Sequence, residues 1–450
     1  MWVAEIKDPV HGYIYLNELE RKIVDTRPFQ RLRRISQLAG ADLTYPGATH
    51  TRFLHSLGTM HLAGVAAEHF RRLGYFGEEE VQMVRLAGLL HDLGHGPFSH
   101  VYEEILDKHR NMTHEDVTQW LIKESEVGEI LEESGYLQEV ADLAVGRLKA
   151  EKHQYAQLLN HIITGPLSVD IMDYLVRDSY FAGVEYGKVD VQRLINSLNL
   201  VENQLAVEYP GALPVLESYI LARIQMFNAV YFHRSVRAAN VMLARAMEYA
   251  DEALKLTGFK ETEEFLRLDD CSTLLSMLNL GGKGGKGEIA ADFARRFVER
   301  RLVKCTYELT VHSPDPFTAN VLNRERIRRQ IEAEIGEEAG VDPKYIFIDV
   351  PSVPSVPLHP DRERSLDIIF FKRGPGGATL QPLSEVPSIL SHLARYIDVI
   401  RVYAPSESRE SVERACMRVF GRGPPSTRAV SYTHLRAHET EAELVCRLLL

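Results

Sequence analysis

The sequence predicts a mainly α-helical protein, in which a helical bundle precedes a smaller α+β unit. At 450 residues the chain exceeds a typical single compact domain. Helical spacing dominates from about residue 16 to about 255, and strand-like runs appear only beyond about 258. The composition, 45% hydrophobic and 26% charged, supplies a large core. We therefore expect a helical domain over residues 1–258 and an α+β domain over 259–429.

Apolar stripes define the helices expected in the first unit. The clearest stripe runs from Glu78 to His91 and is broad enough for a buried helix. Gly94, Gly96 and Pro97 then predict a tight loop. Further helices are expected at Asp116–Lys123, Leu137–Leu148, Asp170–Asp178, Val191–Leu198 and Val215–Leu256, the last of them ended by Gly258.

The second unit contains a glycine-rich run at Gly281–Gly287, which predicts a flexible loop or linker. A phosphate-binding loop is the alternative, but the spacing does not fit a P-loop and neither Ser nor Thr follows Lys286. Strands are expected at Leu302–Val311, Tyr345–Val350, Leu366–Phe371 and Val399–Tyr403, with helices at Arg324–Ile335 and Val386–Tyr396.

The last residues, 430–450, break with the composition that precedes them. We interpret this tail as a translated sequencing adapter that is foreign to the natural protein. In that case His434 and His438 have no functional meaning. An amphipathic terminal helix is the alternative.

Charge and cysteine usage exclude several classes of protein. A net charge of −11 argues against strong binding to nucleic acid or to an anionic membrane. A local basic run from Glu20 to Arg34 still leaves room for a small anionic ligand. The four cysteines are scattered, without the close pairs of a zinc knuckle. The amino-terminal segment lacks the pattern of a signal peptide, and no apolar run reaches the roughly 20 residues of a membrane span. We expect a cytoplasmic protein.

One set of residues carries the chemistry: His55, the adjacent pair His91 and Asp92, and Asp170. Two imidazoles and two carboxylates suit a divalent ion and leave positions for water and phosphate. Helical bundles bring such residues together from separate helices. Core histidines with solvated carboxylates are the alternative, but histidines at 91, 95 and 100 around a glycine-rich bend favour a site.

The surrounding motifs resemble the HD-domain superfamily and its H…HD…D metal signature. More closely, the chain is similar to the deoxynucleoside triphosphate triphosphohydrolases that carry sterile alpha motif and HD domains, and to their bacterial relatives. The resemblance covers about half of the chain, from about residue 6 to about 234. It rests on KDPVHGYI, FQRLRRISQL, YPGATHTRFLHSLG, HDLGHGPFSH, MTHED, VDIMDYLVRDSYF and ARIQMFNAVYFHR.

This resemblance implies hydrolysis of a deoxynucleoside triphosphate to a deoxynucleoside and tripolyphosphate. It implies one divalent ion (Mg, Mn, Fe or Zn) on His55, His91, Asp92 and Asp170, and proton transfer by His95, His100 and His114, with Glu103 paired to His114. The implied substrate contacts are Arg52 and Arg223 on phosphates, Gln37, Tyr174 and Asp178 on the sugar, and Tyr231 beside the base.

Each substrate contact also has an ordinary structural interpretation. Arg52 would serve as an ion-pair partner, Gln37 as a helix-surface residue and Tyr174 as core filling. Arg223 and Tyr231 lie on a long helix where such residues are common. Two positions depart from the family pattern: Ile171 stands where the human member has a lysine on the triphosphate, and Phe232 replaces a glutamine beside the base.

The resemblance also implies a regulatory site. Asp25, Gln30 and Arg33 match positions that recognise the guanine of an activating nucleotide between subunits, which implies a homodimer or homotetramer. An Asp can accept hydrogen bonds from N1 and N2 of guanine, and an Arg can donate to its O6 and N7. A salt bridge between helices is the alternative interpretation of Asp25.

Two other functions stay open. One is a different HD phosphohydrolase activity, on nucleoside monophosphates or phosphodiesters, for which the metal site would be the same. The other is a nucleotide-sensing or scaffolding protein without turnover. The intact set of histidines and aspartates counts against the second, because a site without turnover tolerates their loss.

Overall fold

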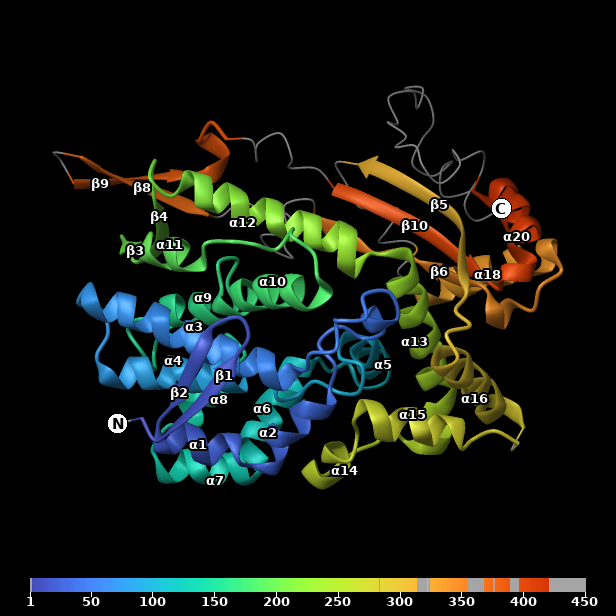
Figure 1. Ribbon diagram of the computed structural model, residues 1–450, viewed down its shortest axis with the longest axis horizontal. Coiled ribbons are helices and arrows are strands. Elements are labelled where there is room, and N and C mark those ends of the chain that lie inside the picture. The colour runs from blue at the N-terminus through green and yellow to red at the C-terminus, as the bar shows by residue number, and fades with distance from the viewer. Residues whose placement is uncertain are drawn as a thin grey trace.

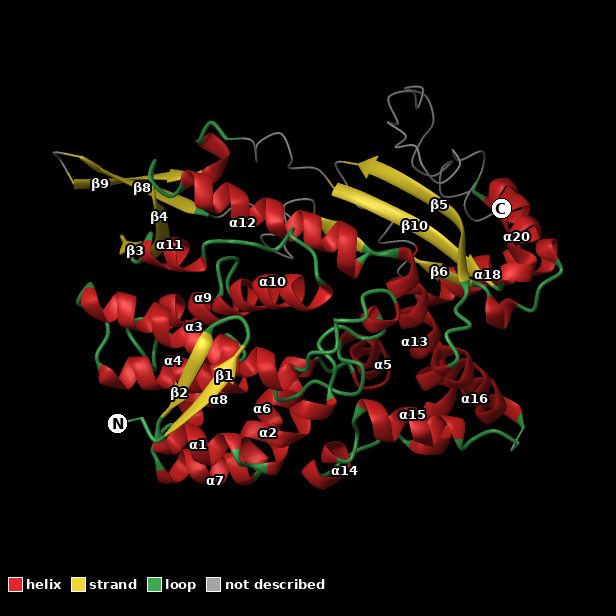
Figure 2. Ribbon diagram, in the orientation of Figure 1, coloured by secondary structure: helices red, strands yellow, loops and turns green. Residues whose placement is uncertain are grey.

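The computed structural model describes residues 2–282, 284–313, 322, 324–354, 368–374, 377–388 and 396–420. Helices form most of the molecule, and strands form a hairpin on its front and two small sheets along one edge (Figures 1 and 2). The predicted fold class, mainly α with a smaller α+β part, is confirmed. The tail over 430–450 and the central part of the helix predicted at Val386–Tyr396 lie outside the described residues.

The amino-terminal segment forms an antiparallel hairpin that the sequence analysis did not predict. Its strands β1 and β2 join through Gly12, whose φ of 81° suits glycine. Helix α1 follows, with a capping box in which Asn17 and Glu20 bind each other's backbone N–H. The elements are β1 (Ala4–Asp8), β2 (Gly12–Leu16), α1 (Glu18–Val24), α2 (Arg27–Arg31) and the short 3-10 turns η1 (Leu32–Arg34) and η2 (Ala41–Leu43).

The central bundle is built around the pair α3 and α4. The helices approach closely because Gly88 lacks a side chain; a Cβ there would lie 2.9 Å from the Cβ of Ala63. The expected helices are present, although the one predicted at Leu137–Leu148 ends at Leu143. The bounds are α3 (Arg52–Arg72), α4 (Glu78–Leu90), α5 (His100–Arg110), α6 (His114–Glu124), α7 (Glu126–Glu133), α8 (Leu137–Leu143), α9 (Ala156–Thr164), α10 (Val169–Ala182) and α11 (Val191–Asn196).

The single long helix predicted at Val215–Leu256 is wrong. The chain forms α12 (Leu213–Met226), a π-helical segment η3 (Phe227–Tyr231) and α13 (Arg234–Leu254). The His233 side chain accepts a hydrogen bond from the backbone N–H of Ser235, so it caps a new helix. Single π-helical turns are frequent at functional sites. Here the turn presents Tyr231 to α10, and Figure 1 shows α12 lying across the top of the bundle.

Beyond α13, the described chain adds five α-helices and the remaining strands of the two sheets. Helix α16 begins at Gly285, inside the run predicted as a loop or linker, and Gly282, Gly284 and Gly285 have positive φ. The bounds are α14 (Thr262–Leu266), α15 (Asp270–Leu278), α16 (Gly285–Val298), β5 (Lys304–Ser313), α18 (Glu325–Ala339), η4 (Pro343–Tyr345), β6 (Phe347–Asp349), β7 (Ser352–Pro354), β8 (Ile369–Gly374), β9 (Gly377–Pro382), η6 (Leu383–Glu385), β10 (Tyr396–Ala404), η7 (Ser406–Ser408) and α20 (Arg409–Val419).

The two sheets attach to the bundle in different ways. One has the order β5-β10-β6, with β7 also paired to β10, and it packs its own core against α18 and α20. The other has the order β3-β4-β8-β9, where β3 (Leu198–Val201) and β4 (Gln204–Glu208) follow α11. Its parallel pair β4–β8 joins chain from both sides of residue 258, and the domain boundary there stays a prediction.

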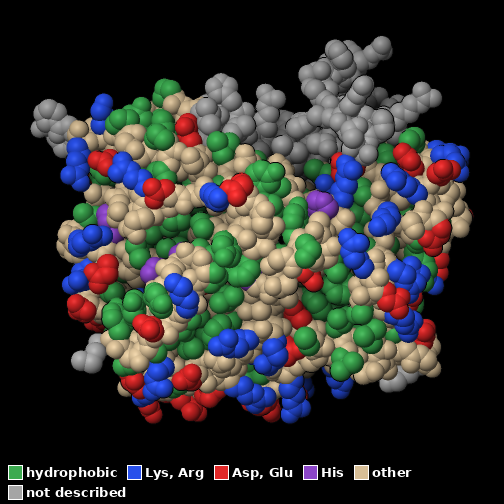
Figure 3. Space-filling model, in the orientation of Figure 1, with side chains coloured by type: hydrophobic (Ala, Val, Ile, Leu, Met, Phe, Trp, Pro, Cys, Tyr) green, Lys and Arg blue, Asp and Glu red, His purple; other side chains and the backbone are tan. Residues whose placement is uncertain are grey.

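The main core extends from Ile14 to Tyr403 and so links both parts of the chain. Buried ion pairs add to this link: Arg237 of α13 binds Asp349 of β6, and Arg245 binds Glu332 of α18. On the outside, acidic and basic side chains are interspersed over the face shown in Figure 3. Among the described helices, the combination of length and apolar character that a membrane crossing needs does not occur.

Candidate active site

The four residues expected to bind a metal meet inside the bundle. His55 stands in the first turn of α3, His91 and Asp92 directly follow α4, and Asp170 stands in the first turn of α10. The Nε2 of His55 lies 3.0 Å from Oδ1 of Asp170 and 3.2 Å from Nε2 of His91. The Nε2 of His91 in turn lies 3.3 Å from Oδ1 of Asp92. We call these four residues the metal centre.

Hydrogen bonds fix both imidazole rings of the metal centre. The Nδ1 of His55 donates to Oδ2 of Asp173 at 2.8 Å, and the Nδ1 of His91 donates to the carbonyl oxygen of Gly88 at 2.9 Å. Since both acceptors lack a proton to give, the hydrogen of each neutral ring is placed on Nδ1. Each Nε2 lone pair therefore faces the centre, which is how metal-binding histidines are oriented.

The charges at the centre also fit a cation. Burial opposes the charged form of His55, but hydrogen bonds with Asp170 and Asp173 raise its pKa to about 10, so a metal ion that binds to Nε2 takes the place of a proton there. Burial likewise disfavours ionised Asp92, but the charges of Arg52 and His91 hold its pKa well below the usual range. Buried carboxylates that stay ionised require positive charge nearby. A bound divalent ion would provide it, and His55, His91 and Asp92 have donor atoms close enough to share one.

Asp173 is a functional residue that the sequence analysis missed. Its buried carboxylate accepts from His55, from His11 at 2.6 Å and from Arg177 at 2.8 Å, and Arg177 also binds Asp8. Gly58 makes room for this network, since a Cβ there would lie 2.0 Å from Oδ1 of Asp173. The spacing of Asp170, Asp173 and Arg177, three and four residues apart, places them on one helix face, but it does not show that Asp173 faces His55.

Arg52 lies at the metal centre, where it is buried. Its guanidinium donates to Oδ2 of Asp92 at 2.6 Å and to Oγ of Ser99 at 3.0 Å. Ser99 and its neighbour Phe98 both have positive φ, 54° and 59°, which is strained for residues with a side chain. The backbone N–H of Phe98 is held by the Asp270 carboxylate at 2.7 Å. Strain of this kind concentrates at functional sites.

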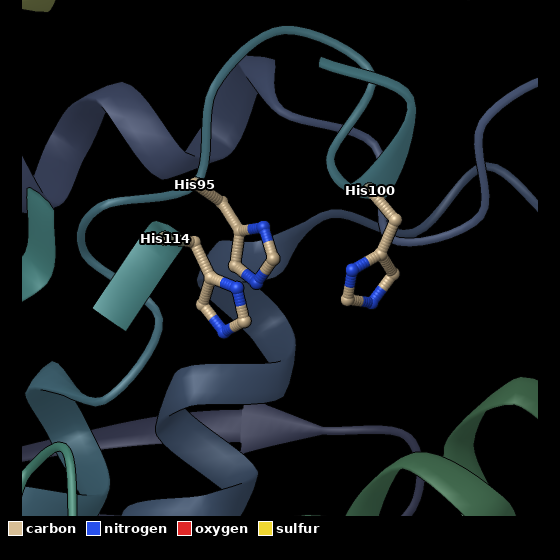
Figure 4. Close-up of side chains that lie close together, drawn as sticks. All are labelled: His95, His100 and His114. Carbon is tan, nitrogen blue, oxygen red and sulfur yellow. The ribbon is translucent and has the colours of Figure 1, made fainter. Parts of the chain in front are cut away.

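Beside the centre lie His95, His100 and His114, which we call the histidine cluster. The rings of His95 and His114 stack with centroids 4.0 Å apart, and His100 stands across from them (Figure 4). Glu103 accepts from Nδ1 of His100 at 2.9 Å and from Nδ1 of His114 at 2.5 Å. Burial opposes the charge on His114, but the bond to Glu103 outweighs it and raises the pKa. Burial, Arg52 and His114 lower the pKa of His95 far below its ordinary value.

Further along α10, Asp178 gathers a second group of polar side chains. The carboxylate of Asp178 accepts from Tyr231 and from His50, each at 2.7 Å. The ring of Tyr174 meets that of Tyr231 edge to face, and burial raises the pKa of Tyr174 to about 12. His50 was also missed, although it stands in the quoted YPGATHTRFLHSLG segment.

Two residues expected to bind substrate have polar atoms that bond nothing within the described chain. The buried Oε1 of Gln37 has no hydrogen-bond partner there, although the Gln37 backbone N–H donates to the carbonyl of His50. The buried Nε of Arg223 is also unpartnered in the described part, and its guanidinium stands over Phe227. Buried polar groups are normally satisfied, so these two atoms are available to a ligand.

The three residues expected to recognise guanine lie on the surface of α1 to η1. Arg33 donates to Oε1 of Gln30 at 2.8 Å and stacks over Phe53. Asp25 instead forms an exposed ion pair of 3.5 Å with Arg21, four residues earlier at the end of the same helix, so this pair is not the salt bridge between helices of the alternative interpretation. The structure therefore joins Gln30 to Arg33, whereas Asp25 binds elsewhere.

Two protein-family models match this chain. The model of the HD domain matches residues 52–178, and that of the HD-associated region matches residues 189–428. The chain belongs to the HD-domain phosphohydrolase superfamily. The first match contains all four residues of the metal centre and the whole histidine cluster.

Relatives of this HD-domain protein share much of its length. The uncharacterized protein YwfO of Bacillus subtilis is 32% identical over 363 residues, 76% of this chain and 78% of that protein. The deoxynucleoside triphosphate triphosphohydrolase SAMHD1 homolog of Dictyostelium discoideum is 30% identical over 276 residues, 59% of this chain and 53% of that relative. A crystal structure of a hypothetical protein from Aquifex aeolicus has a TM-score of 0.71 and 30% identity, covering 92% of this chain and 99% of that one.

Proposed function

We propose that this protein hydrolyses deoxynucleoside triphosphates to a deoxynucleoside and tripolyphosphate, with a divalent ion on His55, His91, Asp92 and Asp170. The observation that carries the proposal is the convergence of these four donor groups, with His95 of the histidine cluster 3.3 Å from Asp92. The similarity to the Dictyostelium triphosphohydrolase supports the choice of substrate. A bound ion would lower the pKa of a coordinated water and neutralise charge at phosphorus.

Arg52 and Arg223 are proposed to hold the phosphates. A guanidinium fork matches phosphate oxygens in a bidentate way that an ammonium group does not. Arg52 already stands beside the centre through its bonds to Asp92 and Ser99. Ile171 supplies no cation where the family's human member has lysine, so these arginines carry more of the binding of the triphosphate.

The histidine cluster is proposed to move protons. His114 donates to the departing 5′-oxygen, because Glu103 keeps its imidazole protonated to higher pH. His95 is held neutral and lies 3.3 Å from Oδ1 of Asp92, so it borders the α-phosphate as a hydrogen-bonding group. His100, on the exposed side of the cluster, connects the cluster to solvent.

The polar side chains around Asp178 are proposed to recognise the sugar. Asp178 and Gln37 hold the 3′-hydroxyl, and Tyr174 packs under the ring with Tyr231 next to the base. A tight contact with Tyr174 leaves no room for a 2′-hydroxyl, which discriminates against ribonucleotides. The existing bonds of Asp178 to His50 and Tyr231 keep its carboxylate in place.

Turnover with identified products tests this function. Purified protein is loaded with Mg, Mn, Fe or Zn and assayed against every deoxynucleoside and ribonucleoside triphosphate. We expect deoxynucleoside and tripolyphosphate in equal amounts, with ribonucleotides slower. Release of orthophosphate with a diphosphate intermediate, or activity on monophosphates or phosphodiesters instead, would point to another HD phosphohydrolase.

We also propose that a guanine nucleotide activates an assembled dimer or tetramer through Asp25, Gln30 and Arg33. Asp25 and Arg33 are exposed and Gln30 is half-buried beside Arg33, so the exposed pair is accessible to a second subunit and a nucleotide. Coupling of about 1–3 kcal/mol corresponds to roughly 5- to 150-fold activation. Asp25→Ala is expected to lose this response and keep basal turnover. Equal rates and equal masses by light scattering, with and without guanosine triphosphate, would leave Asp25 as a surface ion-pair residue.

A further inference from the structure

The histidine cluster has the geometry of a cation site of its own. Nitrogen atoms of His95, His100 and His114 all lie within 4.8 Å of one another. Figure 4 shows the side-by-side rings of His95 and His114 facing His100 across a shared space. His95 comes from the loop after α4, while His100 begins α5 and His114 begins α6. Three backbone segments thus present imidazoles to one point.

Glu103 orients two of these rings. One carboxylate oxygen binds Nδ1 of His114 and the other binds Nδ1 of His100. With Nδ1 engaged, the Nε2 atom of each ring is left to face outward from the carboxylate. A carboxylate behind a histidine is the usual second layer of a protein metal site, where it fixes the ring and makes it a better donor.

His95 supplies the third nitrogen. Its side chain is buried, and its Nδ1 has no hydrogen-bond partner in the described chain. A buried ring nitrogen without a partner requires an explanation, because such groups are nearly always satisfied. Coordination of a cation would satisfy it. The Arg52 guanidinium binds Oδ2 of Asp92 and forms no hydrogen bond with this nitrogen.

We propose that His95, His100 and His114 form a second cation site, selective for zinc and separate from the metal centre. Three imidazoles form a borderline-soft donor set that favours zinc over the hard ions magnesium and calcium. Four-coordinate zinc with three histidines keeps one position for water or another ligand. The exposed position of His100 gives the ion a route in from solvent.

The site has a regulatory consequence, which rests on the proposed function. The nitrogen lone pairs that would bind zinc belong to the histidines proposed to transfer protons. A proton and a zinc ion cannot occupy the same lone pair. Zinc in this site therefore inhibits turnover that another divalent ion supports in the metal centre.

Cobalt binding tests the site without reference to activity, because cobalt replaces zinc and absorbs visible light. Equilibrium dialysis of the metal-free protein should give two bound cobalt ions per chain. His100→Ala should lose one of them and keep the other; this side chain is 69% exposed, so its removal spares the fold. The matched control is His109→Ala, an exposed histidine on the same helix, which should still bind two. One ion in the wild type, or two in His100→Ala, would overturn the proposal.

Two glutamates next to His114 sharpen the test. Glu115 also approaches this ring, at 3.6 Å, and could join Glu103 and His114 in a different cation site. The three-histidine site predicts that Glu103→Gln weakens binding of the second cobalt ion by roughly 10- to 100-fold and that Glu115→Gln leaves it unchanged. Loss of the second ion in Glu115→Gln would assign it to the other group. If no nucleotide is turned over, the proposed function fails and the dialysis result still decides whether the site exists.

Discussion

The metal centre and the histidine cluster are neighbours, but they differ in burial and in the hydrogen bonds of their imidazoles. In the metal centre both imidazoles are buried, and each Nδ1 is committed to an acceptor within the protein. In the cluster, His100 is largely exposed and donates a hydrogen bond to Glu103. Burial with fixed partners preorganises donors for one ion, whereas an open side allows exchange with solvent. The contrast assigns the ion that supports turnover to the first region, and proton transfer and the exchangeable zinc ion of the proposed second site to the second.

The largest effect is expected from Asp92→Ala and His55→Ala. Each change removes a ligand, so it both weakens metal binding and misplaces the attacking water. Turnover should be abolished and the bound metal reduced, while circular dichroism shows an intact fold. Metal content is measured beside activity. Full activity in metal-stripped Asp92→Ala would break the assignment of ion binding to this region.

A smaller effect is expected from Asp173→Asn, which keeps the shape and removes the charge. His55 loses its ionised acceptor, so the metal affinity should fall roughly 10- to 100-fold. Arg177 loses one of its two buried carboxylates, which should also lower thermal stability. Asp107→Asn, an exposed change on α5, serves as the control. Unchanged metal affinity would show that Asp173 stabilises the fold alone.

Tyr231→Phe should weaken recognition of the sugar near Asp178 and leave metal binding unchanged. The change removes the hydroxyl that donates to Asp178 at 2.7 Å. A hydrogen bond to a charged group contributes about 1.5–3 kcal/mol, and His50 still holds the carboxylate, so we expect roughly tenfold lower kcat/KM for deoxynucleotides. Metal affinity should not change. A fall in metal affinity as large as that of Asp173→Asn would contradict this separation.

The smallest effect is expected from Glu103→Gln, and it appears in the pH profile. The carboxylate raises the pKa of His114, and the protonated ring is the proposed donor. Activity should therefore fall as pH rises through this raised pKa. Without the carboxylate the pKa falls, so the alkaline limb of kcat should move to lower pH, while activity at lower pH changes less. An alkaline limb at the same pH in both proteins would remove His114 from the proton-donor role.

The sequence predicted the metal centre because its residues lie in short, distinctive motifs on helices with clear apolar stripes. His55, His91, Asp92 and Asp170 were found in this way, and the structure brings them together. One side chain that hydrogen-bonds to this set, that of Asp173, was missed. Asp173 accepts a hydrogen bond from His55 because α10 packs on α3. This is a tertiary contact that spacing along the sequence does not show.

The fold outside the bundle was harder to predict for a similar reason. The apolar spacing of 215–256 runs through the π-helical turn, where Tyr231 donates to Asp178 and His233 caps a new helix. The hairpins β1–β2 and β3–β4 consist of strands of four or five residues. The parallel pairing of β4 with β8 joins segments more than 150 residues apart, beyond the range of any local pattern.

Product analysis in water labelled with heavy oxygen tests the central claim most directly. Metal-loaded protein is incubated with a deoxynucleoside triphosphate in the labelled water. The products are then separated, and their masses are measured by mass spectrometry. Attack at the α-phosphorus places one labelled oxygen in tripolyphosphate and none in the deoxynucleoside, in a single step without a diphosphate intermediate. Labelled orthophosphate together with a deoxynucleoside diphosphate would contradict the account.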